Sequence, residues 1–372
     1  LYHLIFVVKI KIIMKVCIIG NGLTSLSLAQ TLVNLGLKVD LFSDNHRNNY
    51  DKLQTIGISK SNIDFFNKKI LNIDHLLWDI NRIEIFTENS HKENILDFQN
   101  QNKQLFSTIR NNELYSNLLL TLKKNKLFNI KKKIKTILLK KNYELIINCD
   151  LNDAITKKFF YNKFSKNYNS IGHVTIFEHK ELNPNNIATQ IFTSHGPIAF
   201  LPVSKTETSI VYSVRGKKKI EKNELKNLIK KNFEKYEVKK IYDFKSFELK
   251  SADLRVYYYE NILAFGDLLH RLHPLAGQGF NMVLRDIKIL SKIINFKMNL
   301  GIQLDSSVFS EFEKLTKHHN YLFSNSINLI YEFFHLESKI KNRLFSKSIK
   351  TLGKNKVVNK FLIKTADTGI II

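Results

Sequence analysis

The sequence predicts an α/β fold in which a parallel, nucleotide-binding sheet carries an inserted antiparallel sheet and a C-terminal helical region. A strand–glycine turn–helix–strand unit near the start of the chain predicts the first sheet, and a second glycine turn near residue 260 supports it. Short apolar runs that alternate with polar residues between residues 155 and 260 predict the inserted sheet. The 372 residues are sufficient for two or three domains.

The first unit begins with Val16–Ile19, a short apolar run of the kind expected for a central parallel strand. Gly20 permits a tight turn out of this strand. Gly22 leaves space for a pyrophosphate group at the start of the following helix, whose N–H groups and dipole favour an anion. Ser25 holds the third glycine position of the dinucleotide pattern and is small enough for close packing.

The next strand of this unit, Val39–Phe42, ends where dinucleotide-binding folds carry an acid for the ribose hydroxyls. Spacing puts Ser43 at that position, and Asp44, one residue later, is the candidate for the contact. An ordinary strand–turn–helix unit also fits this first motif, so the assignment of a nucleotide site depends on the second motif.

In the second motif, Ile262–Phe265 form a predicted buried strand that ends in Gly266-Asp267, and a helix is predicted over 278–294. Asp267 at the strand end can bind ribityl hydroxyls of a flavin. Pro274 lacks an N–H and can pack against a flat ring.

At the start of the predicted helix, Gly277 and Gly279 allow the backbone to approach that ring. Gln278 and Asn281 supply polar groups there, and the helix dipole favours negative charge on a reduced flavin. His273, just before the loop, is a further polar side chain to which no role in proton transfer is assigned.

The run Leu272–Asn281 closely resembles the flavin-binding segment of the ubiquinone-biosynthesis hydroxylases. These belong to the single-component FAD aromatic-ring monooxygenases that include p-hydroxybenzoate hydroxylase. The resemblance covers nearly the whole chain from Met14. Arg110 with Leu114 is similar to the family's Arg-x-x-x-Leu helix start, in which the arginine contacts FAD, and Gly196–Pro202 resembles a segment of the family's substrate domain.

This resemblance implies an FAD-dependent monooxygenase that hydroxylates the aromatic ring of a polyprenylated phenol in ubiquinone biosynthesis, using O2 and a flavin hydroperoxide. It implies no metal and identifies no catalytic residue. The candidate cofactor-binding residues are Gly20, Gly22, Ser25, Asp44, Arg110, Gly266, Asp267, Pro274, Gly277, Gln278, Gly279 and Asn281.

One family motif is altered: Asp150 is followed by Leu151, where the family has Asp-Gly. Since the family uses that motif in pyridine-nucleotide contacts, two electron sources stay open. NAD(P)H could bind transiently and donate the electrons, or a partner reductase could supply them. Two other functions also stay open: an FAD oxidoreductase acting on isoprenoid chains, and a non-catalytic FAD-containing scaffold of a quinone-synthesis complex.

The resemblance and the elements together predict a discontinuous domain arrangement. Residues 1–13 are expected to be an upstream extension, and 301–372 a C-terminal helical region. The FAD-binding domain is expected to comprise 14–70, 106–155 and 256–300, and the substrate domain 71–105 and 156–255.

The formal net charge of +25 comes mainly from lysines that are scattered through the chain, not gathered in one stripe. Nucleic-acid binding is therefore not expected. Peripheral contact of this basic protein with an anionic membrane surface is expected. Cys17 and Cys149 lie in apolar runs and are interpreted as core thiols of a reducing compartment. We expect a cytoplasmic protein with peripheral contact at the inner membrane.

Overall fold

The computed structural model describes residues 14–43, 53–88, 93–99, 104–132, 136–216, 220–232, 235–340, 351 and 355–370. The expected extension 1–13 and the candidate ribose ligand Asp44 lie outside the described residues.

A six-stranded sheet forms the first layer, in the order β16-β17-β9-β1-β2-β8. Its strands pair in parallel except for β16, which is antiparallel to β17. Because both faces of a parallel sheet are covered, β1 and β9 consist almost entirely of buried apolar residues. The strands are β1 (Lys15–Ile19), β2 (Lys38–Phe42), β8 (Phe128–Lys131), β9 (Leu145–Asn148), β16 (Tyr258–Tyr259) and β17 (Ile262–Ala264).

A nine-stranded sheet forms the second layer, in the order β18-β15-β10-β13-β12-β11-β5-β6, with β14 paired to β10. The predicted antiparallel pairing holds with one exception, because β11 and β5 pair in parallel. Its strands are β5 (Arg82–Thr87), β6 (Leu96–Gln99), β10 (Lys163–His179), β11 (Ile187–Thr193), β12 (Gly196–Pro202), β13 (Glu207–Arg215), β14 (Val238–Ile241), β15 (Lys245–Leu254) and β18 (His270–Arg271).

A small third sheet lies beside these two and consists of β3 (Thr55–Ser59), β7 (Phe106–Arg110) and β4 (Trp78–Ile80). The helices are α1 (Leu23–Asn34), α2 (Lys60–Lys69), α3 (Asn111–Lys123), α4 (Thr136–Asn142), α5 (Ala154–Phe159), α6 (Lys222–Asn232), α7 (Gln278–Asn299), α8 (Ser307–Ile340) and α10 (Lys356–Thr368). The described residues also form the short 3-10 turns η1 (Asp74–Leu76), η3 (Gly266–Leu268) and η4 (Leu275–Gly277).

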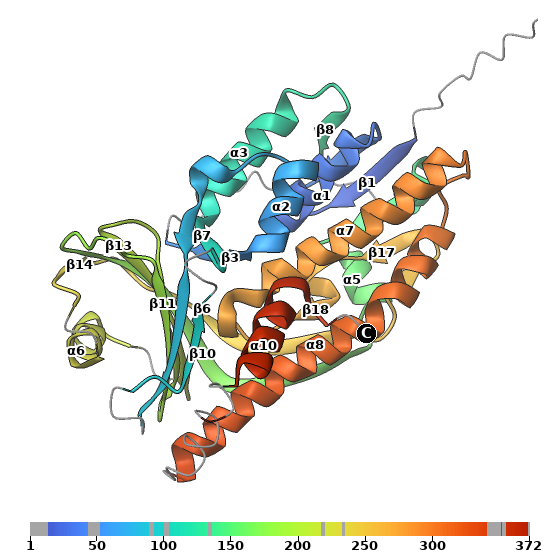
Figure 1. Cartoon of the computed structure of the whole chain (residues 1–372). Helices are drawn as coiled ribbons and strands as arrows, with labels where there is room; N and C mark the ends of the chain where they lie inside the picture. Colours follow the sequence, from blue (N-terminus) through green and yellow to red (C-terminus); the bar gives the residue numbers. More distant parts are fainter. Residues whose placement is uncertain are drawn as a thin grey trace, which may run out of the picture.

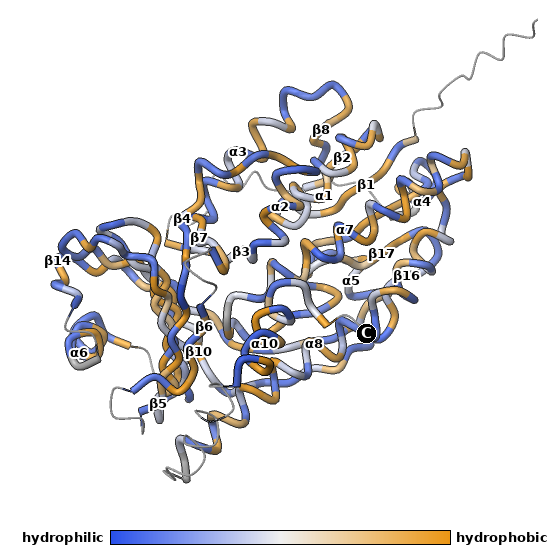
Figure 2. Tube along the Cα trace, in the orientation of Figure 1, coloured by the Kyte–Doolittle hydropathy of each residue, from blue (hydrophilic) through white to orange (hydrophobic). Residues whose placement is uncertain are grey.

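Figure 1 shows the two large layers side by side, with α1, α2 and α7 around the six-stranded sheet and α6 on the outer face of the nine-stranded sheet. The long α8 runs along both layers, and α10 lies close to it. Apolar residues are concentrated along the strands of both sheets (Figure 2). Among the described helices, none combines the length and the apolarity that a membrane crossing requires. The predicted fold class is confirmed.

Two details of the sequence interpretation differ from the structure. The strand that the sequence predicts over Tyr242–Leu249 begins and ends later, because β15 covers Lys245–Leu254, and the strand β14 before it, which ends at Ile241, was not predicted. β14 and β15 both pair with β10, but at different ends of that strand, so the chain leaves the sheet briefly between them. Cys17 is buried as expected, whereas Cys149 is only partly buried.

Candidate functional site

Both glycine motifs leave the same edge of the six-stranded sheet. β1, β9 and β17 are parallel neighbours, with Ile19 opposite Asn148 and Ala264 opposite the same residue. The pairing continues into the turns, since the Phe265 N–H donates to the Asn148 carbonyl at 2.9 Å. Parallel strands end at one edge, so the turns after β1, β9 and β17 surround a common space.

The first and second glycine turns also touch. Gly266 has φ +69°, and a Cβ atom there would lie 2.7 Å from Thr24 Cγ2 in the first turn of α1. Gly20 has φ +113°, and its Cβ would lie 3.1 Å from Ser25 Oγ and 3.4 Å from the Asp150 backbone nitrogen. Glycine is therefore required at both positions by backbone conformation and by the close neighbour.

Two helices begin at this edge without a side-chain cap. Gly22 is the N-cap of α1 and Gly277, at φ +62°, is the N-cap of α7; in the part of the chain that the structure describes, no side chain caps either helix. Since the first N–H groups of a helix have no partner within it, both ends are suited to bind an anionic or electron-rich group.

The remaining candidates of the second motif lie around the start of α7. Asp267 is exposed at the end of β17, where its carboxylate is accessible. Gln278 is buried, and its Oε1 accepts from Arg285 Nη2 at 3.4 Å. A Cβ at Gly279 would meet no described atom within 4 Å, so open space lies beside that backbone. Pro274 is half-buried just before η4.

The side chain of Asn281 is fully used inside the protein. Its Oδ1 accepts from the Ser59 N–H at 2.8 Å, and its Nδ2 donates to the carbonyls of Gly57 at 2.8 Å and Gly277 at 3.1 Å. Asn281 therefore joins β3 to the start of α7. That role was not visible in the sequence, because Asn281 and Gly57 are 224 residues apart.

Arg110 ends β7 and is the N-cap of α3. Its guanidinium donates to the carboxylate of Glu207 on β13, and its Nε lies 3.7 Å from Glu113 Oε1. The structure thus brings Arg110 to the junction with the nine-stranded sheet, where two carboxylates hold it. Its expected contact with FAD stays a prediction.

A buried polar network anchors the second motif. His270 Nε2 lies 2.5 Å from Asp286 Oδ2, and Asn320 Nδ2 donates to Asp286 Oδ1 at 3.0 Å. Burial opposes a charge on His270, but the Asp286 carboxylate outweighs it and the pKa of His270 is raised. Through these bonds α7 and α8 are fixed to β18, which itself pairs with β15.

Next to this network, His273 is buried against aromatic rings of the nine-stranded sheet and α8. Its ring centroid lies 4.9 Å from that of Tyr168 and 4.3 Å from that of Tyr331. Burial first, and the positive charge of Arg215 second, lower the pKa of His273 to about 3. The imidazole is therefore neutral at physiological pH.

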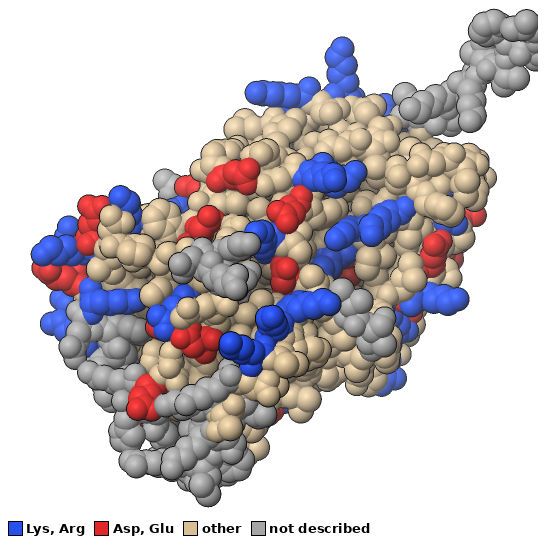
Figure 3. Space-filling model, viewed as in Figure 1, with Lys and Arg blue, Asp and Glu red and all other residues tan. Residues whose placement is uncertain are grey.

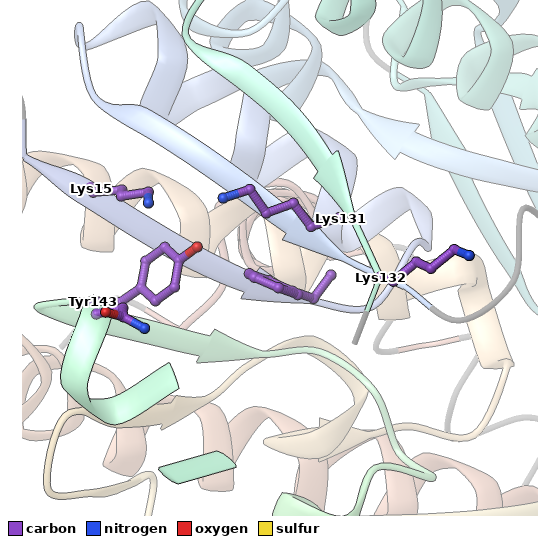
Figure 4. Close-up of a pocket in the computed structure, with 6 residues that line it drawn as sticks. Lys15, Lys131, Lys132 and Tyr143 are labelled. Carbon is purple, nitrogen blue, oxygen red and sulfur yellow. The ribbon is translucent and has the colours of Figure 1, made fainter. Parts of the chain in front are cut away.

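A separate hollow of about 480 Å³ opens between β1, β2 and β8 (Figure 4). Lys15, Lys131 and Tyr143 line it, and all three bond to the buried Asp40 carboxylate, at 3.2, 2.8 and 2.6 Å. Burial raises the pKa of Asp40, but these bonds and one from Asn129 outweigh it and lower the pKa to about 2. This carboxylate is fully engaged, so it does not replace Asp44 as a ribose ligand.

Basic side chains do not form one stripe on the face shown in Figure 3. Lys and Arg lie among acidic and uncharged atoms there.

Comparisons with known proteins agree with this geometry. The p-nitrophenol 4-monooxygenase PnpA of Pseudomonas putida superposes with a TM-score of 0.77 and 11% identity, covering 97% of this chain and 99% of that one. HpxO of Klebsiella pneumoniae, in complex with FAD and uric acid, gives a TM-score of 0.73 at 13% identity and covers 96% and 97% of the two chains. At these identities the likeness establishes the fold.

Sequence relatives confirm the resemblance inferred from the motifs. The ubiquinone biosynthesis monooxygenase COQ6 of Caenorhabditis elegans is 24% identical over 219 residues, which are 46% of this chain and 48% of the relative. The ubiquinone hydroxylase UbiL of Rhodospirillum rubrum is 26% identical over 163 residues, which are 42% of this chain and 38% of the relative. The chain thus spans less than half the length of these curated relatives.

A family model gives the wider match. The model described as squalene epoxidase matches residues 142–352, which include β9, the second glycine motif and most of the nine-stranded sheet. Because this match covers more than half of the chain, the protein belongs to the squalene epoxidase family that the model describes.

Proposed function

We propose that this protein is an FAD-dependent monooxygenase that hydroxylates the ring of a lipid-tailed phenol in ubiquinone biosynthesis. The observation that carries the proposal is the contact between the two glycine turns, in which Gly266 lies against Thr24 at the carboxyl edge of one sheet. A dinucleotide that spans both turns would use the N–H groups of α1 for its pyrophosphate and those of α7 for its flavin ring.

The residues at this edge fit FAD. Gly20, Gly22 and Ser25 would surround the pyrophosphate, and Asp267 would bind ribityl hydroxyls. Pro274, Gly277, Gln278 and Gly279 would lie against the ring system. When bound, FAD supplies the redox chemistry that activates O2. The protein's own residues bind and orient the ring of the substrate and exclude water from it.

The ring of the substrate would lie between the second glycine motif and the nine-stranded sheet. β18 belongs to that motif and pairs with β15, so the sheet forms one wall directly beside the proposed flavin site. A buried cluster of aromatic and aliphatic side chains lies in this region and would supply the apolar lining of such a site.

Peripheral membrane contact is part of the proposal, since a lipid-tailed phenol resides in a membrane. Leu329, Phe333 and Leu336 are exposed on α8 at helical spacing and form an apolar stripe. Lys166 lies nearby, paired with Glu332. We expect flotation with anionic vesicles that weakens when the three apolar residues are replaced by serine.

The experiment that tests the proposal uses purified protein whose FAD is first reduced with dithionite under anaerobic conditions. The reduced protein is then mixed with O2 and one of two prenylated phenols, one with an unsaturated tail and one with a saturated tail. We expect a yellow protein that inserts one oxygen atom into the ring of both compounds, as shown by mass spectrometry of the products. Oxygen insertion only in the unsaturated tail would identify an epoxidase acting on isoprenoid chains instead. FAD binding without any product would favour a non-catalytic scaffold.

The electron source is tested in the same preparation. Anaerobic bleaching of the flavin by NADPH or NADH alone would identify a transient nicotinamide donor. Bleaching only by dithionite, with restored turnover on addition of a reductase, would identify a partner protein as the donor.

A further inference from the structure

His273 is a buried histidine whose hydrogen-bonding groups have no protein partner. Its side chain is 1% exposed, and among the residues that the structure describes neither Nδ1 nor Nε2 has a hydrogen-bond partner. A buried donor or acceptor that has lost its water and found no replacement typically costs about 1–3 kcal/mol. Native structures rarely keep such a group without a reason, and binding of a polar ligand is one.

The side chains beside His273 do not supply the missing bonds. The Tyr168 hydroxyl donates to Asn328, and the Tyr331 hydroxyl lies 3.4 Å from Ser170 Oγ. The two tyrosines therefore meet His273 through their rings, at 4.9 and 4.3 Å between centroids. The imidazole of His273 is therefore a polar group on a surface that is otherwise formed by aromatic rings, which we call the aromatic wall.

This wall is built from three parts of the molecule. His273 comes from the second glycine motif, Tyr168 from β10 of the nine-stranded sheet and Tyr331 from α8. Phe192 and Phe334, one from the sheet and one from α8, stack nearby with centroids 3.7 Å apart. A flat aromatic ligand that enters this cluster can stack on rings while its single polar group meets the imidazole.

We infer that His273 holds the hydroxyl of the phenol substrate, with one imidazole nitrogen accepting a hydrogen bond from the phenol O–H. This inference rests on the proposed function and adds a named residue to it. The hydrogen bond orients the ring and directs electron density into it, which makes the ring more reactive toward an electrophilic oxygen. Arg215, whose guanidinium carbon lies 5.7 Å from the Tyr331 ring centroid, adds positive charge beside the same hydroxyl.

His179 provides a matched control because it is equally buried but fully bonded. It is 1% exposed, its Nδ1 lies 2.8 Å from the Lys180 carbonyl, and its Nε2 lies 3.0 Å from Thr208 Oγ1. His179→Phe removes two satisfied bonds and should lower the melting temperature clearly. His273→Phe removes a group without partners and should leave the melting temperature unchanged or higher. This comparison requires neither flavin nor substrate.

The ligand test uses a 2-prenylphenol and its O-methyl ether, which differ only in the hydroxyl hydrogen. Equilibrium dialysis against the FAD-loaded wild-type protein should show about tenfold tighter binding of the phenol, the value of one good hydrogen bond. His273→Phe should bind both compounds equally. His273→Gln, which keeps an acceptor, should retain part of the preference and also serves if the phenylalanine variant fails to fold.

Three results would overturn the inference. Equal binding of phenol and ether by the wild-type protein would remove the hydroxyl contact, and an unchanged preference in His273→Phe and His273→Gln would assign it to another residue. A melting temperature lowered as much as in His179→Phe would show that His273 is satisfied by internal water. If the wild-type protein binds neither compound, the proposed substrate class fails, while the melting comparison still decides whether His273 lacks a partner.

Discussion

Two kinds of turn leave the carboxyl edge of the six-stranded sheet, and they differ in what satisfies their polar groups. In the turn after β9, Asn148 Oδ1 accepts from the Asp150 N–H at 3.0 Å, and Asp153 Oδ1 accepts from the Ile155 N–H at 2.8 Å and caps α5. The turn after β1 has Gly22 at the N-cap and, within the described residues, no capping side chain.

We call a turn closed when side chains of the protein bond to its backbone polar groups, and open when no side chain caps the helix that follows it. The turn after β9 is closed, and the turn after the neighbouring strand β1 is open. The closed turn carries Leu151 where the resembling family has glycine, and it satisfies its own backbone through side chains. The open turn exposes its helix N-terminus to the space that Gly266 also faces. Capping by the protein and binding of an anion are alternative uses of the same N–H groups. We therefore propose that the ligand binds at the open turns.

The largest effect is expected from Gly266→Ala. The new Cβ would lie 2.7 Å from Thr24 Cγ2 at a backbone angle of +69°, so the two open turns must separate. The left-handed conformation alone costs about 1–2 kcal/mol for a residue with a side chain. We expect FAD affinity, measured by fluorescence titration, to fall by more than about tenfold.

Gly301→Ala is the matched control for this change. Gly301 also has φ +69°, but a Cβ there meets no described atom within 4 Å. It should share the backbone strain and keep FAD. Adding Thr24→Gly to Gly266→Ala should restore part of the affinity. Equal FAD loss in both single variants would mean that strain, and not contact between the turns, is responsible.

A second variant is designed to convert the open turn after β1 into a closed turn. Gly22→Asp gives α1 a capping carboxylate, which should stabilise the FAD-free protein by a few tenths of a kcal/mol. The same carboxylate would occupy the N–H groups and repel a pyrophosphate, so FAD affinity should fall by at least about tenfold. Gly22→Asn caps without charge and should weaken FAD less. Urea unfolding without flavin and titration with flavin measure the two effects, and unchanged FAD binding in Gly22→Asp would contradict the proposed site.

The sequence was sufficient for features that depend on neighbouring residues. The strand, turn and helix around Gly20 and Gly22 were predicted within a few residues of β1 and α1, because apolar runs and glycines determine them locally. Features that join distant segments were missed. The bonds from Asn281 to Gly57 and the ion pair of Arg110 with Glu207 each link two sheets or a sheet and a helix, and no local pattern contains both partners.

The strand β14 was missed for a similar reason. In this region the sequence predicts a strand over Tyr242–Leu249 and none over Val238–Ile241. The chain forms two strands here because β14 and β15 pair with different ends of β10. A pattern within one strand does not contain the register of its partner.

Asp40 and the side chains that bond to it form a closed polar cluster within the same sheet. The contribution of Asp40 to the stability of the protein should depend on pH. Its pKa is lowered from 3.8 to about 2 in the folded protein. A carboxyl group with a depressed folded pKa contributes stability above its unfolded pKa and loses it as pH falls through the folded value. We expect Asp40→Asn to lower the free energy of unfolding by about 2 kcal/mol at pH 7, with the difference vanishing between about pH 4 and 2.

Urea unfolding at several pH values measures this effect. Glu260→Gln removes an exposed carboxylate that pairs with Lys140 at 2.6 Å, and it should change the free energy of unfolding much less than Asp40→Asn does. FAD affinity should be unchanged in Asp40→Asn, since the cluster lies apart from the open turns. A pH-independent loss of stability would instead indicate altered packing around Asp40.

The smallest expected effect comes from opening the closed turn. Asp153→Ala removes the cap that accepts from the Ile155 N–H, and loss of an N-cap typically costs about 1 kcal/mol. Asn152→Ala, at an exposed neighbouring position, should be nearly neutral in the same urea titration. Because α5 satisfies its own N-terminus, FAD affinity should be equal in both variants and the wild type. A loss of FAD affinity in Asp153→Ala that exceeds its loss of stability would place this turn within the cofactor site, and the division into open and closed turns would then fail.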